Sequence, residues 1–186
     1  MKPKVLVGIT GGIAAYKTAD IVSKLVQAGC DVRVVMTPSA TRFIAPLTFA
    51  ALTQKAVLTT LLPDDPTEEK ENIFPHLYPA TESDLILIAP ATANTIAKLA
   101  HGLGDNVVTC SALSLSKNAL RFFCPAMNKQ MWEQPIVQEN VEKLKQLHWK
   151  QIGPAAGNLA CGTAGTGRMT NPTDVVQTLL QALQVK

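Results

Sequence analysis

The stretch KVLVGITGGIAAYK, residues 4–17, decides the fold. It opens with an apolar run that lacks regular polar alternation, which is typical of a strand buried on both faces of a parallel sheet. Gly11 and Gly12 follow, and a helical pattern over residues 13–29 then ends at Gly29, a residue suited to a C-terminal cap. A buried strand, a glycine turn and a helix predict one βα unit of an α/β protein.

The same order recurs along the chain. Further strand-like runs cover residues 31–37, 84–90 and 120–126, with a shorter one near 149–153. The helical patterns between and after them cover residues 40–54, 93–103, 131–147 and 172–183. This alternation predicts a doubly wound parallel sheet in three α/β/α layers, a Rossmann-like architecture of the flavodoxin-like type.

Composition fits one domain spanning residues 1–186. Hydrophobic residues make up 47% and charged residues 17%, which favours a buried core, and the net charge of +3 is scattered, which argues against nucleic-acid binding. No apolar run is long enough to span a membrane, and no signal-peptide pattern is present. The four cysteines lie far apart, so neither a zinc site nor a disulfide framework is indicated. We expect a cytoplasmic protein that does not bind membranes.

Ligands of such sheets bind beyond the carboxyl ends of the strands, so the residues after each strand are the first candidates. The turn TGGIAA, residues 10–15, lets a ligand approach the backbone closely and presents helix N–H groups. It is either an anion site of the nucleotide type or only a tight turn. Neither the G-x-G-x-x-G fingerprint nor the phosphate-loop lysine motif is present.

The later strand ends carry small and amide residues. Ser39 and Thr41 follow the second strand and either cap the next helix or bind phosphate. In PATANT, residues 90–95, Asn94 is a helix cap or part of a surface for a flat ring. Asn128 of PAMNKQMW, residues 125–132, also follows a strand end, at a position suited to a helix cap. These strand ends carry no obvious acid, base or metal-binding cluster. A catalytic site here would therefore need a cofactor to supply the reactive group.

The stretch GNLACGTAGTGRM, residues 157–169, surrounds Cys161 with glycines. A lone cysteine is usually a buried filler, but a filler needs no glycines around it. A mobile glycine-rich flap, spanning about residues 154–171, could instead bring a thiol over a bound substrate. Cys30, Cys110 and Cys124 lie in or beside predicted core elements and are interpreted as packing residues.

Together, TGGIAAYK, His76 with Asp84, PATANT, PAMNKQMW and the LACG and GRM segments resemble the flavin-containing cysteine decarboxylases over essentially the whole chain. The resemblance implies FMN as cofactor and three catalytic residues. These are His76 near the reacting thiol, Asn128 on the substrate carboxylate, and Cys161 as proton donor. The FMN contacts that it implies are Gly11, Gly12, Ile13, Ser39, Thr92, Ala93, Asn94, Thr95 and Ala126. The substrate contacts are Asn128 with Met127, Ala160, Arg168 and Met169.

The implied activity is that of a carboxy-lyase of coenzyme A biosynthesis, which converts 4'-phospho-N-pantothenoylcysteine to 4'-phosphopantetheine. The substrate would be oxidised to a thioaldehyde, lose CO2, and then be reduced. The resemblance also implies a homo-oligomer, either a trimer or a dodecamer built from trimers, with its sites at subunit interfaces. A fused or separate phosphopantothenoylcysteine synthetase is a further implied partner.

Two departures from the family pattern affect the expected site. Leu77-Tyr78-Pro79 follows His76 where Ile-Glu-Leu is usual, and Thr163 replaces an aspartate of the flap. Two alternatives remain open: a peptidyl-cysteine decarboxylase, and a non-catalytic flavin-binding regulatory subunit. The LACG flap favours the first reading over the peptide enzyme, and the absence of acidic tails weighs against the regulatory subunit.

Overall fold

The computed structural model describes residues 2–62, 74, 76–158 and 164–184. Its centre is a five-stranded parallel sheet in the order β2-β1-β3-β4-β5, which confirms the flavodoxin-like prediction. The strands are β1 (Lys4–Ile9), β2 (Asp31–Met36), β3 (Leu85–Ala91), β4 (Leu120–Pro125) and β5 (Trp149–Gln151).

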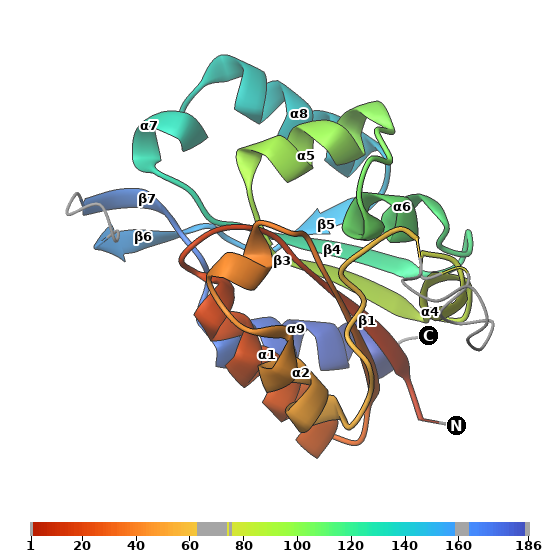
Figure 1. Ribbon diagram of the computed structural model, residues 1–186. Coiled ribbons are helices and arrows are strands. Elements are labelled where there is room, and N and C mark those ends of the chain that lie inside the picture. The colour runs from red at the N-terminus through yellow and green to blue at the C-terminus, as the bar shows by residue number, and fades with distance from the viewer. Residues whose placement is uncertain (1, 63–73, 75, 159–163, 185–186) are drawn as a thin grey trace.

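Helices cover both faces of this sheet, so the molecule has three layers (Figure 1). One face carries α1 (Ala15–Gln27), α2 (Pro46–Thr53) and α9 (Pro172–Gln184). The other carries α5 (Ala93–His101), α6 (Val107–Leu113) and α8 (Pro135–Gln146). The short helices are η1 (Ala40–Arg42), α4 (Tyr78–Thr81) and α7 (Lys129–Trp132).

Successive residues of each central strand enter different cores. Val5, Val7 and Ile9 of β1 join the core beneath α1 and α9, whereas Leu6 joins the core beneath α5 and α8. All four side chains are buried, as expected for a strand covered on both faces. The apolar run that lacked polar alternation is therefore explained by two cores rather than one.

Proline residues divide two of the predicted helices. The pattern over residues 40–54 forms η1 and α2, and α2 begins at Pro46. The pattern over residues 131–147 forms α7 and α8, and α8 begins at Pro135. Proline lacks the N–H that an interior helical bond needs, so each continuous helix predicted here was wrong.

A two-stranded antiparallel hairpin, β6 (Ala155–Asn158) and β7 (Ala164–Arg168), projects beyond the carboxyl edge of the sheet (Figure 1). It forms the described part of the expected flap. Ala160, Cys161 and Thr163 lie outside the described residues. The start of β1 and the end of α9 lie together on the opposite side of the molecule. Within the described ranges, no helix has the length and apolarity to cross a bilayer.

Candidate active site

The carboxyl ends of β1, β2, β3 and β4 surround one large cavity of about 1050 Å³. The cavity brings together nearly all the residues predicted for the site. Those lining it are Gly11, Gly12, Ile13, Ser39, Thr92, Ala93, Asn94, Thr95, Ala126, Met127, Asn128, Arg168 and Met169. The topology causes this convergence, because parallel strands place their following loops at one edge.

The turn after β1 forms a cradle with the loop after β2. A Cβ at Gly11 would overlap the Oγ and Cβ of Ser39, so only glycine at this position lets Ser39 pack directly against the turn. Ser39 does not cap η1; its Oγ instead lies 3.1 Å from the Oγ1 of Thr37. No side chain caps the start of α1 either. Backbone N–H groups and hydroxyls at a helix start suit a phosphate group.

Thr10 holds the neighbouring strand ends in register at this edge. Its Oγ1 donates to the carbonyl of Pro90 at 2.6 Å and accepts the N–H of Thr92 at 3.3 Å. Thr92 in turn is the N-terminal cap of α5, because its Oγ1 accepts the N–H of Thr95. The cap reading of Asn94 was therefore wrong, and Asn94 lines the cavity from the first turn of α5.

Asn128 is both a cap and a cavity residue. Its Oδ1 accepts the N–H of Gln130 at 2.8 Å at the start of α7, while the residue lines the cavity. The cap bond uses Oδ1 as an acceptor, and an amide side chain also carries N–H donors of the kind that bind a carboxylate. The preceding Met127 donates its N–H to the carbonyl of Gly167 at 3.0 Å, so β7 lies directly against this segment.

Lys17 is a cavity residue that the sequence interpretation missed. Its Nζ donates to the carbonyl of Met169 at 3.2 Å, and Arg168 lies close enough to act on its charge. Desolvation by burial, and then the Arg168 charge, lower the pKa of Lys17. Two cations at one part of the cavity suit an anionic ligand group. The sequence feature that could have indicated it is the position of Lys17 in GGIAAYK, in the first turn of the helix that follows the glycines.

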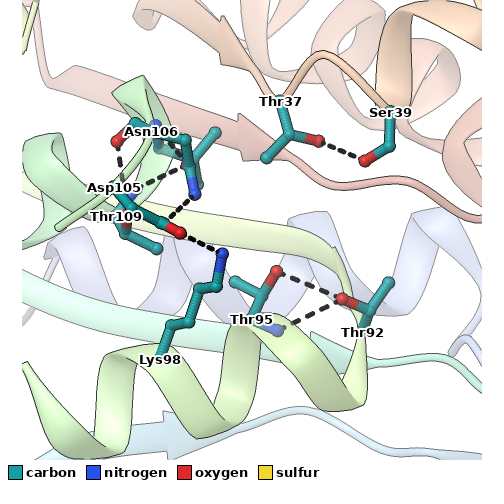
Figure 2. Close-up of polar contacts among 9 residues, drawn as sticks. Thr37, Ser39, Thr92, Thr95, Lys98, Asp105, Asn106 and Thr109 are labelled. Atoms are coloured by element: carbon teal, nitrogen blue, oxygen red, sulfur yellow. Dashed lines mark hydrogen bonds and ion pairs between the residues drawn. The ribbon is translucent and has the colours of Figure 1, made fainter. Parts of the chain in front are cut away.

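Lys98, Asp105 and Asn106 were also missed, although they line the same cavity. Figure 2 shows Lys98 of α5 reaching toward Asp105, just before α6, with Thr37 and Ser39 across from them. The hydrogen bond and charge of Lys98 help to lower the pKa of Asp105. All three residues lie in ANTIAKLAHGLGDN, where Lys98 belongs to one helix and Asp105 and Asn106 precede the next. The sequence pattern did not clearly separate these two helices, so the contact across the turn was not predicted.

His76 does not line this cavity. It precedes α4, whose Tyr78 lies with Lys4 and Asp31 around a small cavity at the amino ends of β1 and β2. His76 is half-buried, and among the described residues its Nδ1 is buried without a hydrogen-bond partner. The structure therefore does not place His76 at the large cavity of its own chain.

The buried cysteines fit their predicted packing role. Cys30 and Cys124 are buried, and desolvation raises the pKa of both thiols. Cys110 is partly exposed, and burial also raises the pKa of its thiol. A thiol with a raised pKa is a poor nucleophile at neutral pH. These three cysteines therefore do not compete with Cys161 for a chemical role.

Comparison with known proteins agrees with this geometry. The Flavoprotein family model matches residues 1–184, so the chain belongs to the Flavoprotein family. A Streptococcus mutans protein named probable phosphopantothenoylcysteine decarboxylase is 40% identical over 183 residues, covering 98% of this chain and 100% of the relative. In Bacillus subtilis, the coenzyme A biosynthesis bifunctional protein CoaBC is 43% identical over 173 residues, covering 93% of this chain but 41% of the relative. The chain thus spans under half the length of such bifunctional relatives.

Solved structures match the whole fold. A PPC decarboxylase in which a cysteine is replaced by serine, complexed with pantothenoylaminoethenethiol, superposes with a TM-score of 0.88 at 29% identity, covering 99% of this chain and 100% of that one. The FMN-binding protein AtHal3 superposes with a TM-score of 0.85 at 30% identity, covering 100% and 99%. The resemblance inferred from the sequence is therefore confirmed.

Proposed function

We propose that this chain is an FMN-dependent decarboxylase that converts 4'-phospho-N-pantothenoylcysteine to 4'-phosphopantetheine in coenzyme A biosynthesis. One observation carries the proposal. A relative named for this decarboxylase matches 98% of the chain and is itself matched over 100% of its length. The whole of that relative is thus matched by this chain, and no part of the relative lies outside the match. A cytoplasmic location fits the proposal and stays a prediction.

The cavity fits FMN at two places. The cradle of Gly11 and Ser39 lines the cavity with the backbone of a turn before a helix and with a hydroxyl, and both suit a phosphate. The start of α5, from Thr92 to Thr95, offers small side chains and hydroxyls along one wall, where a flat ring can lie. When bound, FMN supplies a two-electron acceptor for substrate oxidation and returns those electrons after CO2 has left.

The residues of the chain bind and orient the substrate. Asn128 would hold the carboxylate through a neutral amide, which positions the group without stabilising its charge against departure. Arg168 and Lys17 would bind the substrate phosphate, because they are the cations of the cavity that are not paired with a carboxylate in the described structure. Cys161 would deliver the final proton to carbon from the flap.

His76 would act from a second copy of the chain. Within one copy, His76 does not line the large cavity at the carboxyl ends, and α4, which begins two residues after it, borders the small cavity at the amino ends of β1 and β2. A catalytic His76 therefore requires a site shared between subunits, as expected for the proposed homo-oligomer. Large apolar side chains beside the cavity support a subunit contact there, since Ile13 is 57% and Tyr16 60% exposed.

Mass spectrometry of the reaction tests the activity. The purified protein should be yellow and should remove CO2 from the phosphorylated substrate, and a peptide with C-terminal cysteine should remain unchanged. Loss of CO2 from the peptide alone would identify the peptidyl-cysteine enzyme instead. No turnover of either substrate by flavin-loaded protein would leave a non-catalytic flavin-binding protein and overturn the proposal.

Mixing two inactive variants tests the shared site. His76→Ala and Asn128→Ala should each abolish turnover. If His76 acts between subunits, an equal mixture refolded together should regain about a quarter of the wild-type activity, because that share of interfaces combines the two intact residues. Activity near zero in verified mixed oligomers would place His76 and Asn128 in sites of one copy. The separately refolded variants, combined afterwards, are the control.

A further inference from the structure

The charged residues that line the large cavity fall into two groups. Lys17 and Arg168 carry unopposed positive charge near Met169. Lys98 and Asp105 form an ion pair, so their part of the cavity has no net charge. The first group suits an anion. The second offers hydrogen bonds without net charge, which suits a neutral polar ligand group.

Asn106 fixes the second group in place. Its Oδ1 accepts the N–H groups of Val108 and Thr109, both at 3.1 Å, and thereby caps α6. Its Nδ2 donates to Oδ1 of Asp105 at 2.9 Å, while Lys98 bonds the other carboxylate oxygen. The carboxylate is thus held from both sides by residues of two different helical segments (Figure 2).

Each member of this cluster keeps hydrogen-bonding capacity. The Lys98 ammonium has three N–H groups and the Asn106 amide has two, and each uses one toward Asp105. The carboxylate has more lone pairs than these two bonds use. The cavity wall therefore presents a donor, an acceptor and a donor in series. The complementary ligand edge has an acceptor, a donor and an acceptor, which is the pattern of an imide, O=C–NH–C=O.

We propose that Lys98, Asp105 and Asn106 recognise the imide edge of the flavin ring, with Asp105 accepting the imide N–H. The inference rests on the proposed function, because FMN carries such an edge on the ring and a phosphate at the other end. The cradle of Gly11 and Ser39 takes the phosphate, so the two ends of one ligand meet two chemically different walls of one cavity.

An FMN analogue methylated at the imide nitrogen tests the assignment. The methyl group removes the only N–H of that edge and leaves both carbonyls and the phosphate intact. The protein, stripped of flavin, should bind this analogue about tenfold more weakly than FMN, which is the effect of losing one hydrogen bond to a charged acceptor. Fluorescence quenching on titration gives both dissociation constants without any turnover.

Three variants separate the roles. Asp105→Ala should bind FMN and the analogue with nearly equal affinity. Lys98→Met should weaken both ligands, because it removes a bond to a carbonyl that both share and one of the two bonds that hold the Asp105 carboxylate. Asp20→Ala, which removes the exposed Asp20–Lys24 ion pair of α1, should behave like the wild type. Circular dichroism confirms that each variant is folded.

Equal affinity of the wild-type protein for FMN and the analogue would overturn this inference, as would unchanged discrimination by Asp105→Ala. Neither outcome bears on the decarboxylase activity, which requires FMN to be bound but does not require this particular contact. Conversely, a protein that binds neither ligand refutes the proposed function itself. The two failures are therefore distinguishable in one titration.

Discussion

Replacing Gly167 with alanine tests how the flap hairpin positions Asn128. Gly167 has a φ of +146°, and a Cβ there would overlap the carbonyl oxygen of Met127. The obstacle is backbone, so no rotamer change relieves it. The same two residues share the hydrogen bond from the Met127 N–H to the Gly167 carbonyl. Because Met127 precedes Asn128 directly, moving β7 away also moves the residue proposed to hold the carboxylate.

The cost has two parts. Forcing a side chain into a conformation of this kind costs about 1–3 kcal/mol, and loss of the hydrogen bond adds about 1 kcal/mol. The free energy of unfolding should fall by roughly 2–4 kcal/mol, which lowers the melting temperature by about 5–15 °C in a chain of this size. If Asn128 shifts by about 1 Å, kcat should fall about a hundredfold.

Thermal denaturation and steady-state kinetics measure the two effects. Gly29→Ala is the matched control, because Gly29 also has a positive φ, +87°, but a Cβ there meets nothing within 4 Å. It should cost about 1–2 kcal/mol of stability and leave kcat unchanged. If Gly167→Ala retains wild-type kcat at a temperature where it is folded, the hairpin does not position Asn128.

Three further outcomes are expected. Cys161→Ser should still release CO2 but accumulate an oxidised product two mass units lighter than the normal one on mass spectrometry, and normal saturated product would contradict its role as proton donor. Phe123→Ala should lower the free energy of unfolding by about 3–5 kcal/mol in denaturant titration, because Phe123 is fully buried against Trp149; a change under about 1 kcal/mol would contradict that packing. The lowered pKa of Lys17 means that it loses its charge at a lower pH than an ordinary lysine. The KM for the phosphorylated substrate should therefore start to rise at moderately alkaline pH, and Arg168→Met should move that rise to higher pH; a KM–pH profile unaltered by Lys17→Met would refute the assignment.

The strand order and the cavity followed from patterns that each act locally. Buried apolar runs such as residues 85–91 are typical of strands in a parallel sheet covered on both faces, and the topology then gathers the loops after the strands. Helix breaks were less predictable. Pro46 and Pro135 are at the first helical turn of α2 and α8, and the apolar pattern alone did not show that a new helix starts there.

The two lysines missed in the sequence share one cause. Lys17 and Lys98 each belong to a helix whose exposed face is expected to carry lysine, so their sequence context does not distinguish a surface charge from a cavity charge. What distinguishes them is a partner distant along the chain or beyond a turn, Met169 for one and Asp105 for the other. His76 is the reverse case. The family motif predicts a catalytic role for it, but no pattern within one chain can indicate whether that role belongs to the same copy or to a neighbouring one.

The placement of the chain ends has a practical meaning. The first strand starts, and the last helix finishes, on the side of the molecule remote from the cavity mouth. A second catalytic module joined behind α9 would thus be tethered without obstructing ligand entry, and an affinity tag at either end should be equally harmless. The same arrangement separates the attachment point of a joined module from the cavity in which the product would form. Release into solvent and transfer between neighbouring copies are therefore two routes by which the product could reach that module.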